Sequence, residues 1–129
     1  MYCLDTNILV DILRGDNELA IKVNKELNNF NVYITSITLC ELFRGAFAHS
    51  DSHKKILEVK NFVSNFELLG LDEDSCEEFG RMFFELKKSG KTAKEFDVII
   101  ASIVKSNDLV FVTRDKKHFE KVGIKVESW

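Results

Sequence analysis

The sequence predicts an α/β fold in which helices cover both faces of a parallel sheet. Short apolar or β-branched runs alternate with longer segments whose apolar residues recur three and four positions apart. This alternation is typical of a parallel α/β sheet. The 129 residues match the commonest size of a domain, and no Pro/Gly/Ser-rich or low-complexity segment divides them, so we expect a single domain over residues 1–129.

Five short runs are predicted to be strands. Each is apolar or rich in β-branched residues and is only a few residues long, as expected for a strand. The predicted strands are residues 1–4, 32–35, 66–71, 109–113 and 124–127.

Seven segments are predicted to be helices. Ile8, Leu9, Ile12 and Leu13 illustrate the helical spacing, and Gly15 ends that segment. Asp, Asn and Ser residues mark several of the helix starts. The predicted helices are residues 7–14, 17 or 18 to 28, 38–48, 51 or 52 to 63, 74–89, 94–105 and 115–121.

Composition limits the functions that this chain can have. Its 18 basic and 21 acidic side chains give a net charge of −3, so any contact with nucleic acid must be local. Cys3, Cys40 and Cys76 form no C-x-x-C pair and are expected to be small buried hydrophobic residues. No apolar run approaches the roughly 18 residues of a membrane span, and a strand at the N-terminus leaves no room for a signal peptide. We therefore expect a cytoplasmic protein.

Four acidic side chains are predicted to meet at one edge of the sheet. Asp5 follows the first strand, and Thr113 and Asp115 follow the fourth. Glu41 lies about one turn into the helix after the second strand, and Asp97 lies in the first turn of the helix before the fourth. Ligands of open parallel sheets bind outside the carboxyl ends of the strands, so all four acids can face one crevice.

Such a cluster indicates metal-dependent phosphodiester chemistry. Carboxylates beside core residues persist when they are paired, hydrogen-bonded or bound to a metal. Ligands that are all oxygens favour Mg²⁺ or Mn²⁺ over Zn²⁺. A divalent ion in this setting activates water for phosphodiester hydrolysis. Without the ion, repulsion within the cluster should raise at least one carboxyl pKa.

Each acid also has a structural explanation. Asp5 and Asp115 are placed to cap helices, Asp97 to interact with a helix dipole, and Glu41 to pair with Arg44 three residues later. These four explanations are independent of one another, and it is less expected that all four apply at one sheet edge than that the acids form a common site.

Four segments together resemble the PIN domain, and in particular the VapC-type toxin ribonucleases of bacterial and archaeal toxin-antitoxin pairs. They are LDTNI at residues 4–8, ITSIT at 34–38 followed by Glu41, DVIIAS at 97–102, and VTRD at 112–115. The resemblance runs along the whole chain and depends on the order and spacing of the segments.

This resemblance implies a three-layer α/β/α sandwich, a divalent-metal site and endonucleolytic cleavage of structured RNA such as tRNA or rRNA. It also implies an antitoxin protein as partner, whose tail would lie in an apolar groove near the acids, and a homodimer. The implied catalytic and metal-binding residues are Asp5, Glu41, Asp97 and Asp115, with Asn7 and Thr113 in supporting positions. The family often has Asn where this chain has Asp115, and Glu95 is an additional carboxylate without an assigned role.

Further side chains near the acids are candidates for contacts with RNA. Arg14, Arg44 and Arg114 are adjacent to acid-bearing segments, and guanidinium groups bind phosphates in bidentate fashion. For His118 we favour packing or a surface role over RNA contact or proton transfer.

Two other classes of Mg²⁺-binding α/β protein fit this sequence less well. Receiver domains have paired acids after the first strand, and haloacid-dehalogenase phosphatases have a second Asp where this chain has Asn7. The stronger alternative is a PIN-fold module that binds RNA or protein without catalysis, and the presence of all four acids argues against it.

Overall fold

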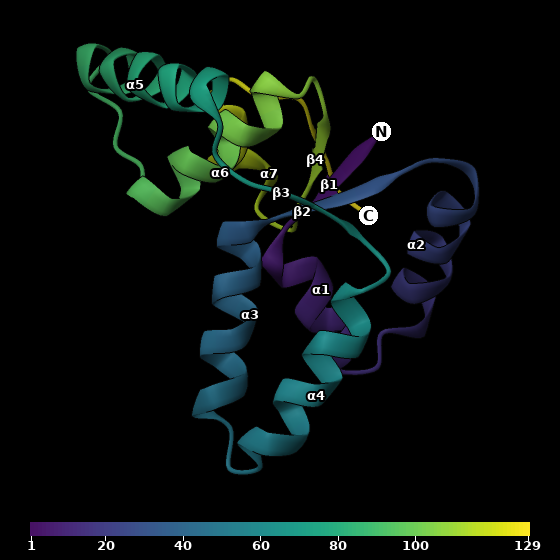
Figure 1. Cartoon of the computed structure of the whole chain (residues 1–129). Coiled ribbons are helices and arrows are strands. Elements are labelled where there is room, and N and C mark those ends of the chain that lie inside the picture. The colour runs from purple at the N-terminus through teal and green to yellow at the C-terminus, as the bar shows by residue number, and fades with distance from the viewer.

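The computed structural model describes residues 1–129 and contains one parallel five-stranded sheet of order β3-β2-β1-β4-β5 (Figure 1). The strands are β1 (Tyr2–Leu4), β2 (Val32–Thr35), β3 (Glu67–Leu69), β4 (Val110–Val112) and β5 (Val126–Glu127). The helices are α1 (Thr6–Leu13), α2 (Asn17–Asn29), α3 (Ser36–Ala48), α4 (Ser52–Val63), α5 (Glu73–Lys88), α6 (Glu95–Ser106) and α7 (Lys116–Glu120).

Helices cover both faces of the sheet, which confirms the three-layer prediction (Figure 1). Successive side chains of a strand point to opposite faces. Leu4 and Val112 accordingly pack with residues of α1 to α4, whereas Cys3 and Phe111 pack with residues of α5 to α7. Two apolar cores therefore hold the sheet between them.

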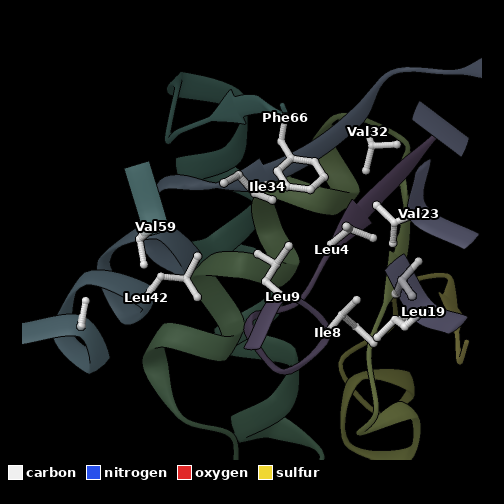
Figure 2. Close-up of a cluster of buried hydrophobic side chains, with 12 residues drawn as sticks. Leu4, Ile8, Leu9, Leu19, Val23, Val32, Ile34, Leu42, Val59 and Phe66 are labelled. Carbon is white, nitrogen blue, oxygen red and sulfur yellow. The ribbon is translucent and has the colours of Figure 1, made fainter. Parts of the chain in front are cut away.

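The core on the side of α1 to α4 fixes helix α1, which begins directly after the first predicted acid, Asp5. Ile8 and Leu9 of α1 are fully buried beside Leu4, and Leu42 of α3 joins the same cluster (Figure 2). Burying a side chain of this size contributes about 1.5–3 kcal/mol. The positions of α1 and α3 relative to β1 are thus set by close packing.

The order of the strands places a crevice between β1 and β4. The chain moves outward from β1 to β2 and β3, then returns to the other side of β1 to form β4 and β5. Such a reversal separates the connections on either side of it and opens a ligand site outside the carboxyl ends of the two strands. Asp5 and Thr113 come directly after these strands.

Most element boundaries agree with the sequence prediction, and the differences have local causes. Helix α3 begins at Ser36 rather than residue 38, because the Thr35 hydroxyl accepts the Thr38 N–H and caps the helix. Strand β3 is shorter than the predicted 66–71, since the chain soon reaches Asp72, which forms a capping box with Ser75 at the start of α5.

The prediction that all three cysteines are buried is wrong for two of them. Cys3 is buried in β1, but Cys40 and Cys76 lie on exposed helix positions. None of the helices combines the length and the apolar character needed to cross a bilayer.

Candidate active site

An open pocket of about 410 Å³ brings together the four predicted acids, Asp5, Glu41, Asp97 and Asp115. Asp11, Arg14 and His118 line it as well. We call this the acidic pocket. It draws on α1, α3, α6 and the β4–α7 connection, and it lies where the switch in strand order predicts a ligand site.

Asp5 is the most enclosed of the acids, with 8% of its surface exposed. Its Oδ1 accepts the Thr6 N–H at 2.8 Å, and its Oδ2 accepts the Thr113 hydroxyl at 2.6 Å. Burial raises the pKa of Asp5 to about 6, and the charges of Glu41 and Asp97 add to that rise while the two hydrogen bonds oppose it. Asp5 is also the N-cap residue of α1. The side chain therefore caps a helix, as its structural explanation predicts, and also lies in the cluster of acids.

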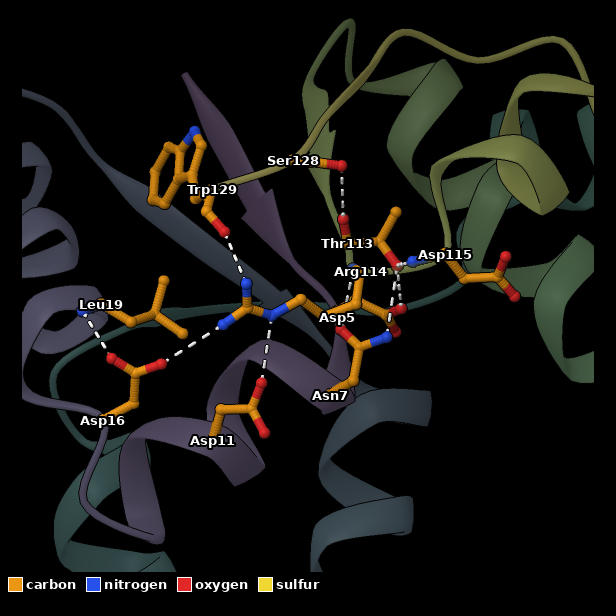
Figure 3. Close-up of polar contacts among 10 residues, drawn as sticks. All are labelled: Asp5, Asn7, Asp11, Asp16, Leu19, Thr113, Arg114, Asp115, Ser128 and Trp129. Atoms are coloured by element: carbon orange, nitrogen blue, oxygen red, sulfur yellow. Dashed lines mark hydrogen bonds and ion pairs between the residues drawn. The ribbon is translucent and has the colours of Figure 1, made fainter.

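Thr113 and Asn7 form a network behind Asp5 (Figure 3). The Thr113 hydroxyl accepts the Asn7 side-chain amide at 3.4 Å and the Asp115 N–H at 3.0 Å. Asn7 Oδ1 in turn accepts the Arg114 N–H at 3.3 Å. These bonds fix the Asp5 carboxylate and tie the end of β4 to α1.

Glu41 is held by a residue that sequence reasoning missed. The Thr6 hydroxyl donates to Glu41 Oε1 at 2.7 Å, which connects the first turn of α1 to α3. The pair with Arg44, which is the alternative structural explanation for Glu41, does not form, and Arg44 does not line the acidic pocket.

Asp97 has His118 as its partner. The His118 Nε2 and Asp97 Oδ2 atoms are 2.9 Å apart, and both side chains are partly exposed in the pocket. This contact corrects the expectation that His118 has only a packing or surface role. One feature of the sequence indicates that His118 lies near the acids. His118 comes three residues after Asp115, the N-cap residue of α7, and residues three apart share a face of a helix.

Of the remaining charged candidates, only one lies in the acidic pocket. Arg14 lines the acidic pocket, whereas Arg44, Arg114 and Glu95 do not. The Arg114 guanidinium extends toward α1 and α2 (Figure 3), donating to Asp11 Oδ2 at 3.1 Å, to Asp16 Oδ2 at 3.3 Å and to the Trp129 carbonyl at 2.7 Å. These contacts give Arg114 a structural role outside the acidic pocket.

The acidic pocket offers oxygen donors but no ready-made metal cage. No three His, Cys, Asp or Glu side chains lie close enough together to hold a metal ion. Mg²⁺ keeps several of its waters and needs only one or two carboxylates from the protein. The four acids therefore suit a hydrated hard cation in donor chemistry, and such a cation would favour the ionised form of Asp5, whose pKa is raised mainly by burial.

Comparisons with known proteins agree with this arrangement. The family model of the PIN domain matches residues 2–125. The tRNA(fMet)-specific endonuclease VapC of Shigella flexneri is 30% identical over 129 residues, which cover 99% of this chain and 97% of that protein. The protein of the same name from Salmonella typhimurium is 32% identical with the same coverage.

A similar fold occurs in a solved toxin-antitoxin complex. The crystal structure of VapBC2 from Rickettsia felis, bound to a DNA fragment from its promoter, contains a chain that superposes with a TM-score of 0.93. The two chains are 25% identical, and the match covers 99% of this chain and 98% of the other.

Proposed function

This chain belongs to the PIN domain family, and from that premise we propose that it is the endoribonuclease toxin of a toxin-antitoxin pair. One observation carries the proposal. Four carboxylates from separate segments of the chain line one pocket, and the most buried of them has a raised pKa. The VapC ribonucleases that align over nearly the whole chain support the same function.

In this proposal Asp5, Glu41, Asp97 and Asp115 hold Mg²⁺ or Mn²⁺ together with water. A bound divalent ion supplies activation of the attacking water and stabilisation of charge on the phosphoryl group. Thr113 and Thr6 fix Asp5, Thr6 also fixes Glu41, and His118 orients Asp97.

The substrate we propose is structured RNA, tRNA or rRNA. Support comes from the names of the relatives, which include a tRNA(fMet)-specific endonuclease. Arg14 is the one Lys or Arg side chain that lines the acidic pocket, and we assign it to a phosphate of this RNA.

The partner we propose is an antitoxin, because the structural neighbours include VapBC complexes. An apolar groove of about 350 Å³ adjoins the acidic pocket and shares Val10, Arg14 and Glu41 with it. Leu13 and Leu42 line the groove, which suits the apolar side of an antitoxin tail. A homodimer and a cytoplasmic location complete the proposal.

The test compares RNA cleavage with and without divalent ions. The purified protein is incubated with total tRNA and rRNA in Mg²⁺ or Mn²⁺ and then in EDTA, beside Asp5→Asn and Asp97→Asn. Asp74→Asn is the matched control, since Asp74 is exposed at the start of α5 and does not line the acidic pocket. We expect cleavage only by the wild type and the control, and only with the metal.

Two outcomes contradict the proposal. Cleavage that survives both EDTA and the two pocket variants would exclude the metal-dependent mechanism. A wild-type protein that binds RNA or a partner but cleaves no RNA would instead be a non-catalytic PIN-fold module.

A further inference from the structure

A further pocket, of about 320 Å³, is lined mainly by basic side chains, in contrast to the acidic pocket. It lies between the second half of α5, the end of α6 and the turn that follows α7. Arg81, Lys91, Lys105 and Lys121 line it against a single acid, Glu85. We call it the basic pocket. This concentration of positive charge is unexpected in a chain of net charge −3.

Part of the basic pocket is held in place by an internal ion pair. Glu78 of α5 accepts from Arg81 and lies 3.5 Å from the ammonium group of Lys105. These two cations lower the pKa of Glu78, so the acid stays ionised and keeps both of them in position. Lys91 and Lys121 form no ion pair, and both are exposed. Their charges are free for a ligand.

The basic pocket and the acidic pocket share two structural elements. Asp97 near the start of α6 lines the acidic pocket, and Lys105 near its end lines the basic pocket. Eight residues of helix separate them by about 12 Å along the axis. The second element is the α7 region, where His118 faces the acids and Lys121 faces the basic pocket.

The two pockets have opposite relations to a nucleic acid. Five acids, Asp11 among them, line the acidic pocket, and they repel a phosphodiester unless a cation intervenes. Affinity for RNA comes mainly from Lys and Arg side chains that neutralise backbone phosphates. Cations placed near the cleavage site but outside it can supply that affinity.

We propose that the basic pocket binds backbone phosphates of the RNA whose cleavage site lies in the acidic pocket. The inference rests on the proposed RNA substrate and adds a second contact region to it. About 12 Å along α6 is a length that a few nucleotides of a strand can span, so one RNA can reach both pockets. The shared elements α6 and α7 keep this spacing fixed, which favours a continuous RNA over an unrelated acidic protein.

The test measures the salt dependence of RNA binding. Fluorescently labelled total tRNA is titrated by anisotropy in EDTA, between about 50 and 200 mM salt. Lys91→Ala/Lys121→Ala removes the two free cations, and Lys25→Ala/Lys60→Ala makes the same change in net charge on exposed positions of α2 and α4. We expect the slope of log Kd against log salt to fall by about 1 for each lysine removed from the basic pocket. The α2/α4 variant should keep the wild-type slope.

Two results overturn the proposal. One is an equal slope and Kd for the two double variants. The second result concerns polyglutamate, which is titrated in parallel with tRNA. If Lys91→Ala/Lys121→Ala weakens the binding of polyglutamate as much as that of tRNA, or more, the pocket recognises an acidic protein instead.

A cleavage assay separates this inference from the proposed function. With divalent metal present, the Lys91→Ala/Lys121→Ala protein should show a raised KM and an unchanged kcat. If the wild-type protein cleaves no RNA, the proposed function is contradicted. The inference about the basic pocket is then still tested by the slopes of log Kd against log salt, because these need only RNA binding.

Discussion

The hydroxyl of Thr113, at the end of β4, donates to Asp5 Oδ2 at 2.6 Å, although the two residues lie 108 positions apart in the chain. Both side chains are almost fully buried. The bond joins the carboxyl ends of the neighbouring strands β1 and β4 at the point where the strand order reverses. The most enclosed acid of the pocket is therefore fixed by the fold itself.

Thr113→Val should reduce both stability and cleavage. The substitution keeps the side-chain shape but leaves Asp5, the Asn7 amide and the Asp115 N–H without a common partner. A buried polar group that loses its partner costs about 1–3 kcal/mol, so the free energy of unfolding in urea should fall by that amount. Thr113→Ser restores the hydroxyl and should recover most of the loss. Wild-type stability and cleavage in the valine variant would contradict the role given to this bond.

The sequence predicts that the acids share one pocket because the sheet brings together the segments that carry them. Parallel strands bring their carboxyl ends to one edge, so the strand assignment alone is enough to place Asp5 and Asp115 together. The side-chain partners were missed, because the bonds from Thr6 to Glu41 and from His118 to Asp97 depend on how packed helices face one another. The bond from Thr6 to Glu41 leaves no local signal in the sequence, and the only signal for His118 is its place three residues after Asp115.

Arg114 shows the opposite error, in which nearness in sequence is misleading. It is adjacent to Asp115 and is therefore expected beside the acids. The chain bends at Arg114 between β4 and α7. Asp115 lines the acidic pocket, while the Arg114 guanidinium is bonded to Asp11 and Asp16 (Figure 3).

The stability of the metal-free protein should fall as pH rises from about 4 to about 6. The pKa of Asp5 is about 6 in the folded protein against 3.8 for an ordinary Asp, so the folded state binds more protons than the unfolded state in this window. Unfolding then becomes easier as pH rises, and the full effect is roughly 3 kcal/mol at the linkage of 1.36 kcal/mol per pKa unit. Above this window the contribution of Asp5 is constant.

Asp5→Asn isolates this contribution from the other carboxyls, such as Asp72 and Asp108, whose lowered pKa values act in the opposite direction. Urea unfolding of wild type and variant at several pH values in EDTA gives the difference directly. We expect the stability of the wild type relative to the variant to decrease across the window. A constant difference would show that Asp5 titrates at its ordinary pKa.

Removing His118 should weaken metal binding and cleavage without unfolding the protein. His118→Ala leaves Asp97 Oδ2 without its only hydrogen-bond partner and frees that carboxylate to rotate. Loss of such an orienting partner typically costs 10- to 100-fold in metal affinity or activity. Mn²⁺ affinity, followed by electron paramagnetic resonance, and kcat are the measurements. His118→Gln retains a side-chain N–H donor and should recover part of both, and equal values for alanine, glutamine and wild type would contradict the orienting role.

Arg114→Ala and Arg14→Ala should have contrasting effects, because Arg114 is held in ion pairs, whereas Arg14 lines the acidic pocket. Arg114 is partly exposed and pairs with Asp11 and Asp16, and exposed pairs contribute about 0–1 kcal/mol each. Its loss should lower the free energy of unfolding by about 1 kcal/mol or slightly more, given the further bond to the Trp129 carbonyl, and should leave the KM for RNA cleavage unchanged. Arg14 lines the acidic pocket, so its loss should raise that KM and leave the unfolding transition where it was. Steady-state cleavage and urea unfolding of both variants check the contrast. A raised KM in Arg114→Ala with normal stability would contradict this structural role for Arg114.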